Sequence, residues 1–154
     1  MMTDTSWLPE ANGKVVKIVA PLLPYLKGGF DSWKSAQKEV DTVNRISPQT
    51  FEEEWSNDSY VVDVRKETEY AAEHVDEAYN KPLDSINNWF MEMDDSKPFY
   101  LHCAGGYRSM IAASILKSRG VHNFKEVDGG FAAIAKTQLP KTDFVCQSKL
   151  QKLS

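Results

Sequence analysis

Short apolar runs alternate along this chain with longer segments of helical spacing, and this alternation limits the available folds most strongly. Three runs rich in β-branched and aromatic residues have the length of buried strands: residues 60–65, 97–103 and 124–127. Four segments carry apolar residues at helical intervals and are predicted helices: residues 67–77, 83–93, 109–119 and 131–138. Strands that alternate with helices favour an α/β fold with a mostly parallel sheet.

Charge and composition exclude several classes of function. The chain of 154 residues has a formal net charge of -4, which argues against nucleic acid as the main partner because phosphate binding needs a basic surface. No apolar run reaches membrane-spanning length, and the acidic start MMTDTSWLPE differs from a secretory signal. Two cysteines, Cys103 and Cys146, make no disulfide framework, so we expect a cytoplasmic protein with reduced thiols. The histidines lack the spacing of a zinc site, and we expect no metal or organic cofactor.

The first 45 residues contain a partial echo of a later segment. LKGGFDSWKSAQKEV (residues 26–40) aligns without gaps to VDGGFAAIAKTQLPK (residues 127–141), including the GGF turn. Too few residues precede Gly28 for a complete repeated unit, so a true repeat would leave only the tail of one copy. A chance match of one short motif is the alternative.

The stretch HCAGGYRS is the candidate site. A predicted strand delivers Cys103 to its carboxyl end, which is where ligands bind in open α/β sheets. Gly105 and Gly106 allow the following loop to curl, and the N–H groups of such a loop form an anion nest. A helix predicted to start near Ser109, together with the charge of Arg108, adds positive potential. These features favour a nucleophilic thiolate at Cys103 and would hold a persulfide anion equally well, whereas the plain alternative is a core cysteine before a glycine turn.

The same loop, CAGGYRS, resembles the active-site loop of rhodanese-family sulfurtransferases. VVDVRKETEYAAEHVDEAYNKPL (residues 61–83) resembles the family's Asp-Val-Arg strand and the segment after it, and VDGGF resembles its closing turn. The resemblance covers residues 47–144, and residues 26–40 look like the end of another such domain. It implies a small, mostly parallel five-stranded sheet with helices on both faces. It also implies three parts: a remnant of a preceding repeat (residues 1–45), a complete catalytic domain (residues 46–145) and a tail (residues 146–154).

The resemblance implies a chemistry. Cys103 would attack a sulfane-sulfur donor, thiosulfate or a low-molecular-weight persulfide, become a persulfide, and pass the sulfur to a thiol or cyanide. The binding loop would be formed by Ala104, Gly105, Gly106, Tyr107, Arg108 and Ser109. Many family members carry a basic residue after the cysteine, so Ala104 weakens the case for thiosulfate as the physiological donor. Four residues separate Cys103 from Arg108, one fewer than in the related phosphatases, which makes the loop too small for phosphate.

Other residues receive supporting or structural roles. Asp63 and Arg65 are expected at the end of a strand beside the Cys103 strand, where Asp63 would bond loop amides and Arg65 would pair with a carboxylate such as Glu69. Direct contact of these two residues with the substrate is the alternative. His102 precedes Cys103 on the strand, so it should face the opposite way and be packed.

The resemblance also supplies a context and a rival function. Tandem rhodanese domains occur behind hydrolases of the metallo-β-lactamase fold, so such a hydrolase is an expected domain or partner of this chain. Rhodanese-like folds that lose their cysteine act as non-catalytic binding modules, and an unreactive Cys103 would favour that function here.

Overall fold

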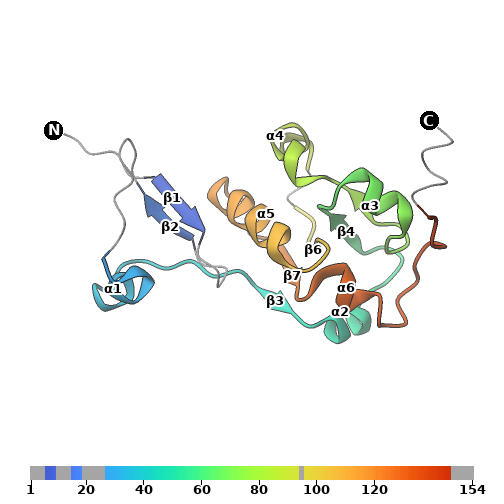
Figure 1. The fold of residues 1–154 in the computed structure, drawn as a ribbon, viewed down its shortest axis with the longest axis horizontal. Helices are drawn as coiled ribbons and strands as arrows, with labels where there is room; N and C mark the ends of the chain where they lie inside the picture. The colour runs from blue at the N-terminus through green and yellow to red at the C-terminus, as the bar shows by residue number, and fades with distance from the viewer. Residues whose placement is uncertain (1–5, 10–14, 19–26, 94–95, 147–154) are drawn as a thin grey trace. The chain divides into compact units, whose positions relative to one another are not determined.

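Two units, Met1–Val43 and Asn44–Ser154, make up the chain. The computed structural model describes residues 6–9, 15–18, 27–93 and 96–146 (Figure 1). In the first unit, β1 (Ser6–Pro9) and β2 (Val15–Ile18) pair antiparallel, and α1 (Gly29–Ser35) follows the glycine pair. Residues 147–154, nearly all of the predicted tail, lie outside the described residues.

The second unit contains a five-stranded sheet. Its strands are β3 (Arg45–Ile46), β4 (Tyr60–Asp63), β5 (Tyr79–Asn80), β6 (Phe99–His102) and β7 (Phe124–Val127). They lie in the order β3-β7-β6-β4-β5, and each neighbouring pair is parallel. The predicted α/β class with a small five-stranded sheet is therefore confirmed. The strand that leads to Cys103 lies in the middle of this sheet.

Helices cover both faces of the sheet. They are α2 (Pro48–Glu54), α3 (Glu67–Ala72), α4 (Ile86–Trp89) between the 3₁₀ turns η1 (Leu83–Ser85) and η2 (Phe90–Glu92), α5 (Tyr107–Ser118) and α6 (Gly130–Ile134). Helices α2 and α6 lie beside each other, whereas α5 contacts β6 and β7 (Figure 1).

Alternation along the strands divides the core into two layers. Phe51 of α2 and Ile134 of α6 are fully buried in one cluster with Val61 and Val127. Successive side chains of a strand point to opposite faces, so the residues next to Val61 and Val127 point to the other face of the sheet. On that face, Ala112 and Leu116 of α5 are fully buried. Each face of the sheet thus has its own apolar layer, and α5 is held in place by the second.

Several predicted boundaries were wrong for local reasons. The helix predicted at residues 67–77 ends at Ala72, and buried Val75 instead bridges to Lys141. The segment 83–93 breaks into one short helix between two 3₁₀ turns. The last predicted helix ends at Ile134, whose carbonyl accepts hydrogen bonds from Thr137.

Three elements of the sheet domain were not predicted. The two-residue strands β3 and β5 are too short to give an apolar pattern, and β5 lies where a loop was predicted. Helix α2 has a readable start, because Ser47 accepts a hydrogen bond from the Thr50 amide and Pro48 occupies the first turn. Among the described residues, no helix is both long and apolar enough to cross a membrane.

Candidate active site at Cys103

Cys103 lies directly after β6 at the carboxyl end of the sheet, and its side chain is buried, with 1% exposed. The backbone N–H of Gly106 donates to Cys103 Sγ at 3.2 Å. Gly106 has φ 100°, a left-handed conformation that favours glycine, and it is the N-cap of α5. Helix α5 begins at Tyr107, two residues before the predicted start, so its free N–H groups lie closer to the sulfur in sequence than expected. The sulfur is thus held at the positive end of a three-turn helix.

The loop itself is clamped from behind by α6. The amides of Phe131 and Ala132 donate to the carbonyl oxygens of Cys103 (2.6 Å) and Ala104 (2.9 Å). In a trans peptide the N–H points away from the preceding carbonyl, so the amides of Ala104 and Gly105 point away from α6. The GGF turn therefore fixes the orientation of the active-site loop.

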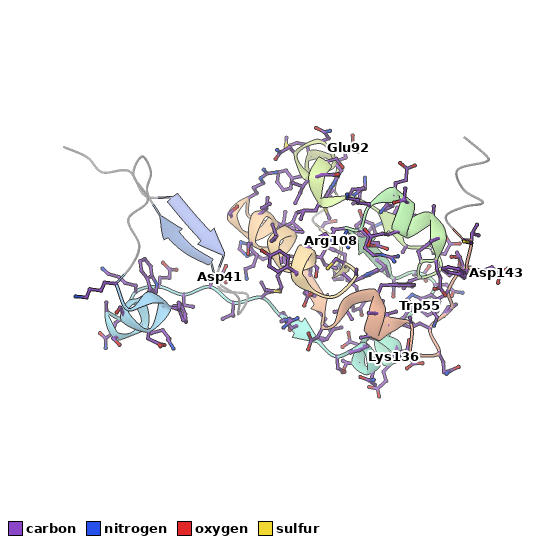
Figure 2. All side chains as sticks on the ribbon, in the orientation of Figure 1. Asp41, Trp55, Glu92, Arg108, Lys136 and Asp143 are labelled. Atoms are coloured by element: carbon purple, nitrogen blue, oxygen red, sulfur yellow. The ribbon has the colours of Figure 1, made fainter. Side chains whose placement is uncertain are left out.

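Arg108 is the charged residue of the loop, and Figure 2 shows it close to the start of α5. Its guanidinium makes a two-pronged ion pair with Glu69 of α3, at 2.6 and 2.8 Å. This pair lowers the pKa of Glu69 and raises that of Arg108. The guanidinium also interacts electrostatically with Cys103. Arg108 thus contributes a charge to the site, but one that Glu69 partly neutralises.

Behind the sulfur lies a buried polar chain that begins at Ser109. Its hydroxyl is 3.4 Å from Cys103 Sγ, 3.0 Å from the Gly106 carbonyl oxygen and 2.6 Å from Glu126 Oε1. Glu126 is fully buried, and its second oxygen accepts from Arg45 Nε at 2.7 Å. Burial raises the pKa of Glu126 above its ordinary value.

Asp63 and Arg65 lie at the end of β4, beside β6, as predicted, but their partners differ. Arg65 does not pair with Glu69: its guanidinium binds Asp63 at 2.6 Å and donates to the Glu73 carbonyl. Asp63 also accepts from the Arg65 amide, and the guanidinium lies 4.0 Å from the centre of the Phe131 ring. Glu69 is instead taken by Arg108 from α5. The pair of Asp63 and Arg65 therefore contacts the GGF turn through Arg65, which lies over the Phe131 ring.

His102 and Tyr107 flank the loop in opposite environments. His102 is fully buried, its ring lies 6.2 Å from that of Phe131, and burial lowers its pKa. Its Nδ1 is 3.3 Å from the Cys103 carbonyl oxygen, and the side chain is packed, as predicted. Tyr107 is 76% exposed at the first position of α5.

Two charged residues of the site were missed, Arg45 and Glu126, whereas Glu69 was predicted with Arg65 instead of Arg108 as its partner. A signal for Glu126 existed, because it follows Phe124 at the strand period of two and therefore shares an inward face with an apolar residue. No comparable signal marks Arg45, which reaches the site through pairing of β3 with β7.

Comparison with known proteins identifies the family to which this loop and fold belong. The family model for the rhodanese-like domain matches residues 47–137. The chain belongs to the rhodanese-like domain family. It is 32% identical over 92 residues to a thiosulfate sulfurtransferase GlpE of Ectopseudomonas mendocina, covering 60% of this chain and 84% of that protein. It is also 32% identical over 96 residues to the uncharacterized protein slr1261 of Synechocystis, and this match covers 62% of this chain but only 54% of that protein.

Solved structures agree on the fold. A rhodanese-related protein of Thermoplasma volcanium superposes with a TM-score of 0.59 at 23% identity, covering 64% of this chain and 97% of that one. A rhodanese-like domain protein of Staphylococcus aureus gives a TM-score of 0.57 at 26% identity, covering 63% and 96%.

Proposed function

We propose that this chain is a sulfurtransferase that carries a sulfane sulfur as a persulfide on Cys103. The observation that carries the proposal is the hydrogen bond from the Gly106 N–H to Cys103 Sγ at the start of α5. A donor N–H and a helix N-terminus stabilise a negative sulfur, whether thiolate or persulfide. Membership of the rhodanese-like family and similarity to a thiosulfate sulfurtransferase support the same chemistry.

The proposed reaction has two steps. The Cys103 thiolate attacks the outer sulfur of thiosulfate, a new S–S bond forms, the S–S bond of thiosulfate breaks, and sulfite leaves. Cyanide or a thiolate acceptor then attacks the outer sulfur of the persulfide, leaves as thiocyanate or a new persulfide, and returns the Cys103 thiolate. The loop of residues 104–109 binds the transferred sulfur, while Asp63 and Arg65 support the loop through Phe131.

The nature of the donor depends on the charges at the pocket. Ala104 supplies no cation, and the guanidinium of Arg108 is shared with Glu69. A doubly charged donor such as thiosulfate therefore finds little unpaired positive charge here. We propose a low-molecular-weight persulfide as the better donor.

We further propose that residues 1–45 are the tail of a preceding rhodanese-like repeat. Both GGF turns adopt one backbone conformation: φ is 84° and 57° at Gly28 and Gly29, and 71° and 56° at Gly129 and Gly130. A helix follows each turn. We also propose a cytoplasmic location, from the two cysteines, and a metallo-β-lactamase-fold hydrolase as adjoining domain or partner, from the family's context.

Intact-protein mass spectrometry tests the function. Wild-type protein is incubated with thiosulfate or with glutathione persulfide, beside the variants Cys103→Ser and Cys146→Ser. We expect wild type and Cys146→Ser to gain one sulfur atom that cyanide removes, with faster loading from the persulfide, and Cys103→Ser to gain none. If neither donor loads the wild type, the sulfurtransferase function is refuted and a non-catalytic binding module becomes the favoured function.

A further inference from the structure

The buried carboxylate of Glu126 has no role in the reaction as proposed above. It is fully buried on β7, and Ser109 contacts both Glu126 and Cys103. A buried carboxylate is costly unless it is paired, and here Arg45 and Ser109 supply one partner for each oxygen. The arrangement is a continuous path of 3.4 Å and 2.6 Å contacts from Cys103 Sγ through Ser109 Oγ to Glu126 Oε1.

The single hydroxyl proton of Ser109 decides what this path does. When Glu126 is ionised, it is the strongest acceptor near Ser109, so the hydroxyl proton points to Glu126. The lone pairs of Ser109 Oγ then face Cys103, and Ser109 accepts the S–H of a neutral thiol. When Glu126 is protonated, it donates to Ser109 Oγ, which frees the hydroxyl proton. The Gly106 carbonyl oxygen at 3.0 Å and the sulfur then compete for that proton, and a thiolate is favoured because it is charged. The two states of Glu126 therefore favour opposite states of Cys103.

We propose that Glu126 is the proton acceptor for Cys103, acting through Ser109. The Cys103 S–H proton passes to Ser109 Oγ as the Ser109 hydroxyl proton passes to Glu126 Oε1. The products are a Cys103 thiolate that accepts a hydrogen bond from Ser109, and a neutral Glu126. Only one proton moves along each contact, so charge and atoms balance without another reactant. Glu126 is a positioning residue in this scheme, because it reaches the sulfur only through Ser109.

The charges around Glu126 suit this exchange. Burial raises the pKa of Glu126 above its ordinary value, and the negative Asp128, directly after β7, acts in the same direction. Arg45 on β3 opposes both, but its guanidinium is divided between Glu126 and Asp128 (2.6 Å). From the side of the sulfur, Arg108 is the charged group that acts on Cys103, and it is itself paired with Glu69.

The inference rests on the proposed function for its purpose, since the thiolate is the species that would attack the donor. The protonation path can nevertheless be measured without any sulfur transfer. The ultraviolet absorbance of the thiolate is titrated with pH in the absence of donor, and the titration of Cys103→Ser is subtracted to remove Cys146 and the tyrosines. Failure of sulfur loading and failure of the relay are thus separate results.

In wild type, the thiolate absorbance should rise in two steps whose midpoints lie more than about one pH unit apart. The reason is that the sulfur and the carboxylate share a proton, so each titrates in a way that depends on the protonation of the other. In Glu126→Gln it should appear in one step that lies between the two, because the amide neither takes up the proton nor carries charge. In wild type, the infrared band of the Glu126 carboxyl should persist beyond the lower step and disappear only at the upper one, and it should be missing in Glu126→Gln.

Two further variants complete the test. Ser109→Ala fits the buried helix, and it should move both steps to higher pH, because thiolate and carboxylate each lose a donor. It also serves if Glu126→Gln does not fold. Glu92→Gln removes an exposed carboxylate that pairs with Lys81 at 3.8 Å, and it should leave the titration unchanged. A single wild-type step that coincides with that of Glu126→Gln, or a lower step unmoved by Ser109→Ala, would overturn the relay.

Discussion

Gly130 joins the GGF turn to the active-site loop, and replacing it by alanine should damage stability and sulfur loading together. Its φ is 56°, in the left-handed region. A Cβ at this position would collide with the carbonyl oxygen of Cys103 and lie 2.9 Å from both the Ala104 carbonyl carbon and the Gly105 amide nitrogen. All three atoms are backbone, so none can rotate away.

The magnitude follows from two terms. A left-handed alanine costs about 1–2 kcal/mol relative to glycine. Overpacking against rigid backbone costs about 1–3 kcal/mol more. We therefore expect Gly130→Ala to lower the free energy of unfolding by about 2–5 kcal/mol, as the sum of these terms.

Alanine substitutions at two other glycines separate the conformational cost from the overpacking cost. Gly120 has φ 91° with nothing within 4 Å of an added Cβ, so Gly120→Ala should show only the conformational cost of about 1–2 kcal/mol. Gly105 has neither a positive φ nor a neighbour within 4 Å of an added Cβ, so Gly105→Ala should change stability by no more than about 0.5 kcal/mol.

Urea unfolding of the three variants and wild type measures these differences, and the rate of sulfur loading is followed by mass spectrometry. Displacement of the Cys103 carbonyl should also slow loading about tenfold or more in Gly130→Ala, since catalysis tolerates little misplacement. If Gly130→Ala costs no more than Gly120→Ala, the turn does not clamp the loop, and the reasoning fails.

Three further predictions concern protonation and the loop. Arg108 lowers the pKa of Glu69 below its ordinary value of 4.5. Their pair therefore stabilises the folded protein above pH 4.5, and this stabilisation is lost as the pH falls through the pKa of Glu69 in the folded state. The difference in unfolding free energy between wild type and Glu69→Gln should accordingly disappear on acidification. Burial lowers the pKa of His102 below 6.5, so wild type should lose stability as pH falls through 6.5, and His102→Asn should show a shallower fall in urea midpoints over that range. Gly106→Ala would make only ordinary van der Waals contacts, 3.5 Å or longer, but it strains φ 100° and turns the amide that binds Cys103 Sγ. Sulfur loading should therefore slow while the free energy of unfolding falls by only about 1–2 kcal/mol. Loading at the wild-type rate would show that this amide does not matter.

The sheet was predictable where the strands are long and buried on both faces. Residues 124–127 form β7 with the predicted bounds, and β4 and β6 lie within their predicted segments. The edge strands β3 and β5 are two residues long, so their pairing depends on neighbours that the local pattern does not contain. The helical spacing of apolar residues also predicted too long a helix at residues 67–77. Val75 fits that spacing, but it is buried in an extended segment rather than on a helix face.

At the candidate site, the features formed by residues close in sequence were predictable, whereas the contacts between separate elements were not. The strand end, glycine loop and helix start around Cys103 are neighbours in sequence, and the structure places Cys103, Gly106 and Ser109 together. The ion-pair partners were not predictable, because Glu69 reaches Arg108 from a different helix and Arg45 reaches Glu126 from an edge strand. Pairing of charged side chains across elements needs the three-dimensional arrangement.

The depth of Cys103 has a consequence for which product leaves the site. Under the proposed function, only 1% of this residue is exposed, so its own sulfur would stay shielded in a loaded protein and an acceptor would reach the added sulfur first. An incoming thiolate then meets the terminal atom and departs with it as a persulfide. Attack on the inner atom would instead release hydrogen sulfide and trap the acceptor in a mixed disulfide. Burial of the Cys103 sulfur would thereby impose regioselectivity: the acceptor receives the added sulfur, and hydrogen sulfide is not released.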